Sequence, residues 1–268
     1  REVSGLWPLT LLVHTRHALL ARRPLAMLAR LDHLRQALPR HHRDPRTLGG
    51  QVLSRCSLEL MLALGEVHRV QHRLDEHDQL PPWLCAAAAR HHLITGRPRR
   101  AVRIAAAAVH RPDVHMRDRQ DLATTLALAH RAQGNTGGMR DALHQGDALG
   151  RLTGNLQPLL EIPVEARSQL LAVAASDLTE QDRALVARAS PLYPEQVELI
   201  TLSPREREVL LQMRRDSTVH TVARSLSVSA NTVKKQLTSV YAKLGVHDRS
   251  SALQRAHSLG LISDEDPT

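Results

Sequence analysis

The chain has 268 residues with 36 basic and 27 acidic side chains, a formal net charge of +9, and it contains no Phe and only two Trp and two Tyr. No apolar run approaches the ~18 residues that span a bilayer, and no signal peptide opens the chain, so we expect a cytoplasmic protein and exclude an integral membrane protein. Leu, Ala and Val must build the core, and this composition favours helix throughout.

The charge is too dispersed to identify a partner. Residues 201–268 hold ten basic and seven acidic residues, and the rest of the excess lies in the longer N-terminal part. The two cysteines, Cys56 and Cys85, form no CxxC pair and lie in apolar helical segments. We expect two buried thiols, with a disulfide or redox pair as the alternative.

The first part of the chain predicts paired helices. Two helices are expected over 6–22 and 25–38, with a break at Pro24. Further helices over 47–64, 82–95 and 117–133 end near Gly65, Gly96 and Gly134 respectively, and each leads into a second helix. A glycine after a helix supplies the left-handed residue that ends it. The glycine spacings bracket the ~34-residue period of helix–turn–helix repeats.

The apolar spacing in these helices indicates packed hairpins. Leu122, Leu126 and Ala129 share one helical face. Such hairpins stack into an α-solenoid, and the Gly/Ala spacing resembles degenerate tetratricopeptide repeats without their usual aromatic landmarks. Helical sequence continues over 164–175 and 179–189. We expect an all-α chain with a helical-repeat sensor or interaction domain at 1–189, a proline-containing linker at 190–201 and a second domain at 202–264.

Metal and catalytic signals are weak. His68 and His72 stand four residues apart with Asp75 nearby, a spacing that zinc could use, but 17 histidines make coincidence the better explanation. The pairs His41–His42 and His91–His92 are adjacent and would point apart on a helix. There is no GxSxG, HExxH or GxxxxGK[ST] sequence. We therefore expect no enzyme, no cofactor, no metal and no P-loop nucleotide site.

The second domain begins with a well-formed helix start. In "LSPREREVLLQM", Ser203 suits the N-cap, Pro204 the first helical position and Glu206 the third position of a capping box. Val209, Leu210 and Met213 give this helix an apolar face. A short helix over 219–226, the turn "SVSA" and a helix from Ala230 then predict a helix-turn-helix, whose second helix suits the DNA major groove.

The helix over 230–244 contains all three lysines of the chain. Its predicted buried stripe is Val233, Leu237, Val240, Tyr241 and Leu244. The opposite side carries Asn231, Lys235, Thr238, Ser239 and Ala242, with Lys234 and Lys243 on its flanks. Short polar side chains with flanking cations fit a DNA groove, although an ordinary solvated helix would show the same pattern.

The stretch from "LSPREREVLLQM" through "TVHTVARSLSVSANTVKKQLTSVYAKLGVHDRSSALQRAHSLGLI" resembles the C-terminal DNA-binding domain of LuxR-type transcription regulators. The resemblance implies four helices, the third in the major groove and the fourth pairing two copies. It implies that Lys234, Lys235 and Thr238 contact base edges or nearby phosphates. It implies that the DNA backbone is contacted by Asn231, Thr232, Ser239, Lys243 and Thr218. The helix over 250–259 would pair two copies of the chain, with Ser251, Leu253, Gln254 and His257 as candidate contact residues.

Three positions depart from that family's pattern. Asp216 stands where Gly is usual, Thr221 where Glu is usual and Gln236 where His is common. The repeat-like region ahead of the domain is similar to the solenoid of MalT-like large regulators, which carry an upstream nucleotide-binding domain. We expect that such a domain was removed before Arg1.

These observations predict a DNA-binding transcription regulator that binds double-stranded DNA as a homodimer. A small-molecule or protein effector on the solenoid and RNA polymerase are further candidate partners, and no membrane is expected. A sigma factor would need an aromatic-rich helix that the chain lacks, and a response regulator would need alternating strands. The open alternative is a helical-repeat interaction scaffold with a vestigial helix-turn-helix module.

Overall fold

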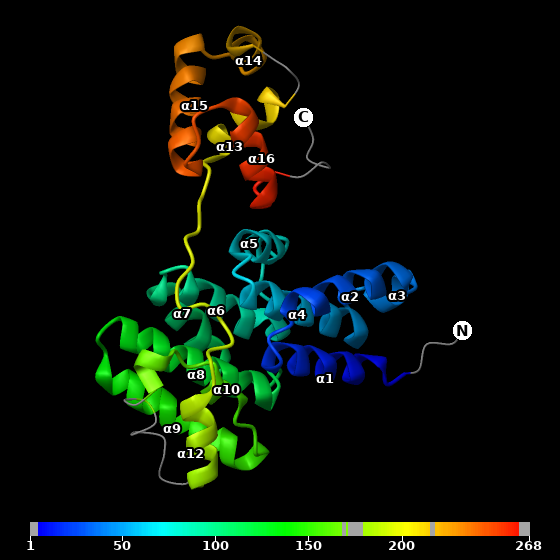
Figure 1. Cartoon of the computed structure of the whole chain (residues 1–268), viewed down its shortest axis with the longest axis vertical. Coiled ribbons are helices and arrows are strands. Elements are labelled where there is room, and N and C mark those ends of the chain that lie inside the picture. Colours follow the sequence, from blue (N-terminus) through cyan, green and yellow to red (C-terminus); the bar gives the residue numbers. More distant parts are fainter. Residues whose placement is uncertain (1–4, 168–169, 171–178, 215–217, 263–268) are drawn as a thin grey trace. The chain divides into compact units, whose positions relative to one another are not determined.

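The computed structural model describes residues 5–167, 170, 179–214 and 218–262. Within these ranges the chain forms helices joined by turns and loops, with no strand, which confirms the all-α prediction (Figure 1). The chain divides into two compact units, residues 1–197 and 198–268. No helix in the described ranges is long and apolar enough to cross a membrane.

The helical unit opens with α1 (Trp7–Leu20), α2 (Pro24–Ala37) and the short α3 (Arg40–Arg43). Pro24 is the first residue of α2, because proline lacks the amide hydrogen that this position leaves unbonded and its fixed φ already suits a helix. In the turn before it, Arg22 has a φ of 60°, the left-handed conformation more often held by glycine. α1 and α2 both pack against α4 (Leu48–Ala63).

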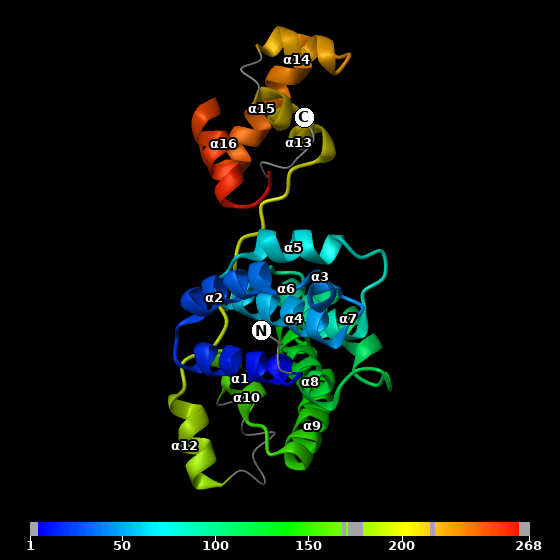
Figure 2. The ribbon, with the colours of Figure 1, turned by 90° about the vertical axis from the view of Figure 1, so that its right-hand side faces the viewer.

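Three helical hairpins follow. They pair α4 with α5 (Val67–Asp75), α6 (Cys85–Ile94) with α7 (Pro98–Ala108), and α8 (Met116–Ala132) with α9 (Thr136–Thr153); the turn η1 (Pro82–Leu84) leads into α6. The turn glycines Gly65, Gly96 and Gly134 have φ of 73°, 69° and 71°, which confirms their predicted role. α4 packs on α6 and α6 on α8, while α5 packs on α6 and α7 on α8 (Figure 2).

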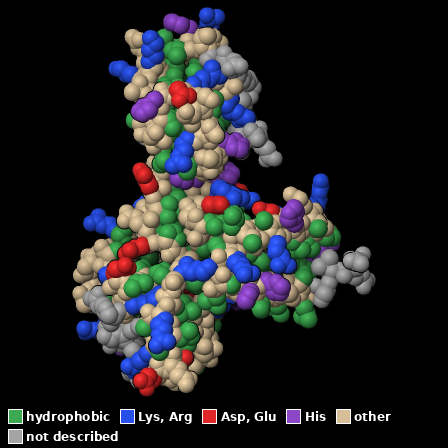
Figure 3. Space-filling view, in the orientation of Figure 1, with side chains coloured by type: hydrophobic (Ala, Val, Ile, Leu, Met, Phe, Trp, Pro, Cys, Tyr) green, Lys and Arg blue, Asp and Glu red, His purple; other side chains and the backbone are tan. Residues whose placement is uncertain are grey.

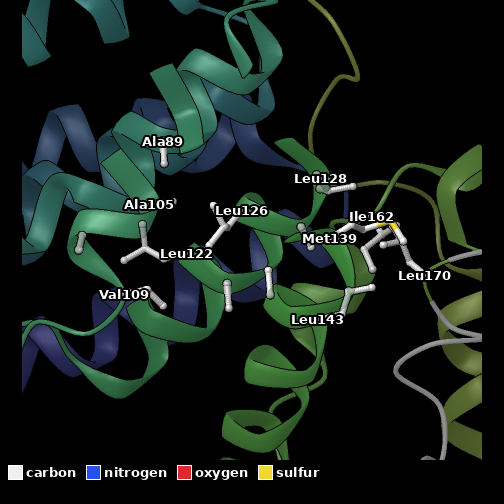
Figure 4. Packing of buried hydrophobic residues seen from close by; sticks show 14 of the residues in the cluster. Ala89, Ala105, Val109, Leu122, Leu126, Leu128, Met139, Leu143, Ile162 and Leu170 are labelled. Carbon is white, nitrogen blue, oxygen red and sulfur yellow. The ribbon is translucent and has the colours of Figure 1, made fainter. Parts of the chain in front are cut away.

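The core of the later hairpins is built around α8. Leu122 and Leu126 lie between alanines of α6 and α7 on one side and side chains of α9 on the other (Figure 4). The small Ala89 and Ala105 let these helices approach closely, so aliphatic side chains suffice without Phe. Labelled neighbours in this cluster are Val109, Leu128, Met139, Leu143, Ile162 and Leu170.

A buried network of ion pairs links helices that are distant in sequence. The Arg55 guanidinium of α4 pairs with Glu59 of α4 at 3.0 Å and with Asp121 of α8 at 3.7 Å, and it also contacts Asp118. Arg16 of α1 pairs with Glu59 at 3.2 Å and with Asp121 at 3.6 Å. All five side chains are at most 13% exposed, so each charge depends on its partners rather than on water.

The segment that follows α12 (Glu180–Arg188) packs against earlier parts of the helical unit. The buried Tyr193 ring lies 4.5 Å beneath the Arg90 guanidinium, which itself pairs with Glu161 just after α10 (Gln157–Leu160). The Val197 amide donates to the Ile94 carbonyl at 2.8 Å. Residues 190–197 of the predicted linker therefore belong to the helical unit. Of the predicted helix at 164–175, residues 168–169 and 171–175 lie outside the described ranges.

The cysteines and histidines occupy separate environments. Cys56 and Cys85 are both free and buried, as predicted, and burial raises the pKa of the Cys56 thiol to about 12. His68 is buried whereas His72 is exposed. In the described part of the chain no three His, Cys, Asp or Glu side chains form a group that could hold a metal ion.

The Arg55 network makes a prediction about stability. Arg55→Met should lower the free energy of unfolding of the helical unit by about 3–5 kcal/mol, because it removes the cation paired with the buried Asp118 and leaves Glu59 and Asp121 to share Arg16. Urea unfolding followed by tryptophan fluorescence measures this directly, since both tryptophans, Trp7 and Trp83, lie in this unit. Arg69→Ala, which removes an exposed pair with Glu66, is the control and should cost less than about 1 kcal/mol. Equal losses in the two variants would contradict the prediction.

Candidate nucleic-acid interface

The second unit consists of α13 (Pro204–Met213), α14 (Val219–Ser225), α15 (Ala230–Leu244) and α16 (Arg249–Ser258). α15 contributes to two apolar clusters. Val233 and Leu237 pack with Val209 of α13 and Val222 of α14. Further along the helix, Val240 and Leu244 pack with α13 and α16; that cluster also contains Leu210, Leu211, Ala252, Ala256 and Ile262.

The predicted start of α13 is confirmed. The Ser203 hydroxyl accepts from the Glu206 amide at 3.2 Å, and the Glu206 carboxylate accepts from the Ser203 amide at 2.6 Å. Pro204 occupies the first turn, where its missing amide hydrogen costs nothing. Both reciprocal hydrogen bonds of the capping box are therefore present, and they fix where the helix begins.

The same carboxylate also binds α15. Ser239 donates its hydroxyl to Glu206 Oε1 at 2.6 Å, and Lys243 donates Nζ to Glu206 Oε2 at 2.6 Å. The Lys243 ammonium also donates to the Thr201 carbonyl at 3.1 Å. Glu206 is only 5% exposed, so these donors replace water around a buried anion. Burial alone would raise its pKa, but the bonds from Lys243, Ser239 and Ser203 lower the pKa to about 2.

Hydroxyl side chains fix the helix-turn-helix between α14 and α15. Thr218 caps α14 by accepting from the Thr221 amide at 3.2 Å, and the two hydroxyls lie 2.9 Å apart. Ser229 caps α15 by accepting from the Thr232 amide at 3.0 Å. Ser227 in the turn has a φ of 53°, so a residue other than glycine adopts the left-handed conformation there.

The buried stripe of α15 is largely as predicted. Val233, Leu237, Val240 and Leu244 are buried and Tyr241 is half-buried. The opposite side exposes Asn231, Thr232, Lys234, Lys235, Thr238 and Ala242.

The outward polar groups of α15 differ in how freely they can move. Thr232 Oγ1 lies 2.8 Å from the Ser229 hydroxyl, and Thr238 Oγ1 donates to the Lys234 carbonyl at 3.0 Å. Within the described ranges Lys234 and Lys235 make no ion pair. Ser239 is half-buried, and its hydroxyl is directed to Glu206. The exposed face thus offers two unpaired ammonium groups beside short hydrogen-bonding side chains.

Charge alone would not single out this face. On the side of the molecule drawn in Figure 3, Lys and Arg side chains occur over both units instead of gathering in one patch. The distinguishing feature is local: cations and short polar side chains share one rigid helical surface. This is the composition that contacts phosphate oxygens and base edges.

α16 exposes part of its predicted pairing surface. Asp248 caps the helix, and Ser251 donates both its amide and its hydroxyl to the Asp248 carboxylate, at 2.9 and 2.6 Å. Leu253 is half-buried against the core of the unit, whereas Gln254 and His257 are exposed. Of the four candidates, Gln254 and His257 present their side chains to solvent most fully.

The three departures from the family pattern have different settings. Asp216 lies outside the described residues. Thr221 takes the third helical position after the Thr218 cap, and its hydroxyl bonds the Thr218 hydroxyl. Gln236 is half-buried on the side of α15.

The arrangement of α13–α16 defines a helix-turn-helix of the DNA-binding class, and comparison with known proteins identifies its family. Residues 200–256 match the family described as bacterial regulatory proteins, luxR family. They form a LuxR-type helix-turn-helix domain, which confirms the prediction for this part of the chain.

The named relatives are also regulators. A stretch of 93 residues is 32% identical to the probable HTH-type transcriptional regulator GfsR of Streptomyces halstedii, covering 35% of each chain. A stretch of 69 residues is 39% identical to the probable transcriptional regulatory protein NarL of Mycobacterium tuberculosis, covering 26% of this chain and 29% of that protein. The chain thus matches about a third of each relative's length. No solved structure matches it significantly.

The Glu206 contacts predict an acid-sensitive domain. Glu206→Gln should destabilise the second unit by about 2 kcal/mol at pH 7, because the charge-assisted bonds from Ser239 and Lys243 of α15 weaken. The lowered pKa means that the wild-type contribution is complete above about pH 4.5 and is lost as the pH falls toward 2. The difference between wild type and variant should therefore shrink below pH 4.5.

Amide hydrogen exchange of peptides from α13 and α15, compared between the two proteins at each pH, measures this difference. Glu208→Gln on the exposed side of the same helix is the matched control and should leave exchange unchanged. A difference that stays constant from pH 7 to pH 3 would refute the assigned role of the carboxylate.

Proposed function

We propose that the chain is a sequence-specific DNA-binding transcription regulator that inserts α15 into the major groove. The observation that carries this proposal is the outward face of α15, with two unpaired lysines on a LuxR-type domain. Lys234, Lys235 and Thr238 contact base edges or the phosphates next to them. Asn231, Thr232 and the α14 cap Thr218 hold the DNA backbone, since short hydroxyl and amide groups bond phosphate oxygens.

Ser239 and Lys243 have a different place in this proposal. Both bind the Glu206 carboxylate, and the Lys243 side chain remains 40% exposed. Their first role is to hold α15 at a fixed angle to α13. Contact of Lys243 with DNA would be made from the exposed part of a side chain that is already anchored.

Two copies bind one operator through α16 in this proposal. Gln254 and His257 lie on its exposed side and would meet their equivalents, with Ser251 and Leu253 at the edge of the contact. A two-fold pair of domains reads two half-sites, so the operator should be an inverted repeat.

The helical unit serves as a tetratricopeptide-like solenoid that senses a small molecule or a protein. Its support is the recurring hairpin with a left-handed glycine at each turn and successive hairpins packed on one another. RNA polymerase is a further candidate partner for a regulator of this kind.

Selection of bound sequences from a random double-stranded pool tests the proposal as a whole. Enrichment of an inverted repeat is expected. Failure to enrich any sequence, together with recovery of a stoichiometric protein partner, would instead favour the scaffold with a vestigial helix-turn-helix.

The selected operator then permits a test of single residues. Lys235→Ala should weaken binding and, where the lysine neutralises one phosphate, reduce the slope of log K against log salt by about 1. Arg188→Ala, an exposed residue of α12 in the other unit, removes the same charge and should leave the slope unchanged. Fluorescence anisotropy from 50 to 300 mM salt measures both. Parallel slopes for wild type and Lys235→Ala would place the DNA contact elsewhere.

A further inference from the structure

A small cavity in the helical unit is lined by arginines from three helices. Its volume is about 170 Å³, and its walls include Arg35 of α2, Arg43 of α3 and Arg73 of α5. α4 packs against α2, α3 and α5 (Figures 1 and 2), and the floor of the cavity comes from α4. Arg73 is distant in sequence from Arg35 and Arg43, so the packing of α5 beside α4 brings it to the other two.

The charges around this cavity are not balanced. The one acidic side chain in its lining is Glu76, 3.4 Å from Arg73 Nη1. Arg35 and Arg43 form no ion pair in the described part of the chain. Burial, and then the neighbouring Arg73, lower the pKa of Arg35 against the opposing effects of Asp32 and Glu76. Like charges held together in a partly buried place are the arrangement that a bound anion relieves.

A buried hydroxyl faces the same cavity without a partner. Ser57 of α4 lines the cavity and is 3% exposed, and its Oγ makes no hydrogen bond to any described residue. Buried hydroxyl groups are ordinarily bonded, so an unbonded one in a cavity wall is available to a ligand oxygen. This observation is independent of the arginines.

The rest of the lining is mostly apolar and includes an indole ring, together with Ser54 and His77. Trp83 is half-buried, and its ring packs edge-on against His77 with 6.0 Å between centroids. Leu58 and Pro45 complete this side. An apolar wall beside a cluster of guanidinium groups suits a ligand with an anionic head and a small organic body.

We propose that this cavity binds a small phosphate monoester. Three guanidinium groups against one carboxylate leave two formal positive charges, which match the −1.5 to −2 charge of a phosphate monoester near pH 7. Arg35, Arg43 and Arg73 hold the phosphate, Ser57 bonds one of its oxygens and Trp83 covers the organic part. The role of this phosphate monoester as the effector of the regulator rests on the proposed function, whereas its binding to the cavity does not.

Titration of the full chain with phenyl phosphate tests the site. Binding should be saturable by calorimetry and should change tryptophan emission, because Trp83 lies in the wall. Inorganic phosphate should bind more weakly, and phenol should not bind. Benzoate binding as tightly as phenyl phosphate would replace the phosphate assignment with a carboxylate site. The absence of saturation by phenyl phosphate up to 20 mM would overturn the proposal.

Two arginines of α5 give a matched pair of variants. Arg73 and Arg69 are each 44% exposed and each is paired with a glutamate three residues away, but only Arg73 lines the cavity. Arg73→Ala should weaken phenyl phosphate binding at least tenfold, and Arg69→Ala should leave it unchanged. Equal effects of the two variants would show that the affinity comes from the general charge of the surface.

Two further variants separate binding from folding. Arg35→Met should lose binding while raising the melting temperature of the unliganded protein by about 2 °C, because like-charge crowding is relieved. Ser57→Ala should weaken binding with no loss of stability, since its hydroxyl has no partner to lose. Unchanged affinity in both would overturn the site. A chain that binds phenyl phosphate but enriches no DNA would refute the proposed function and leave this site standing.

Discussion

A buried carboxylate bound by donors from another helix is the interaction on which both units depend. In the second unit, Glu206 closes the cap of α13 and at the same time receives Ser239 and Lys243 from α15. In the helical unit, Glu59 receives Arg16 of α1 and Arg55 of α4. Small aliphatic cores pack well at several helix angles, whereas a buried ion satisfied in one geometry restricts the angle. For a recognition helix, that angle decides which side chains reach the groove.

The fold was predictable because its signals are local. A glycine in the left-handed conformation ends the first helix of each hairpin, and Ser203, Pro204 and Glu206 begin α13 within four residues. The ion-pair network was not predictable, since Arg55 of α4 and its partners Asp118 and Asp121 of α8 are separated in sequence by α5 and the α6–α7 hairpin. The packing of residues 190–197 was not predictable for the same reason: Tyr193 contacts Arg90, which lies in a distant segment of the chain.

The candidate interface likewise combines features that the local sequence predicts with contacts that only the folded chain creates. Helical phase was enough to separate the buried Val233 stripe from the exposed Asn231 and Lys235. Phase could not show that Ser239 turns its hydroxyl to Glu206, because that acceptor lies in another helix. The anion cavity lies beyond sequence reasoning altogether. Arginine is common in this chain, and what distinguishes these three is the three-helix geometry that places them around a single carboxylate, that of Glu76.

The three lysines illustrate how a compositional signal and a structural role relate. Their concentration in one helix correctly marks α15 as unlike the rest of the chain, but they do not act alike. Lys234 and Lys235 extend from the exposed face, whereas Lys243 reaches back to Glu206 and the Thr201 carbonyl. A flexible ammonium with three donors suits both tasks: it can follow an irregular phosphate or serve two acceptors at once. The same residue type therefore supplies the DNA-facing charge in this proposal and the anchor that holds it in place.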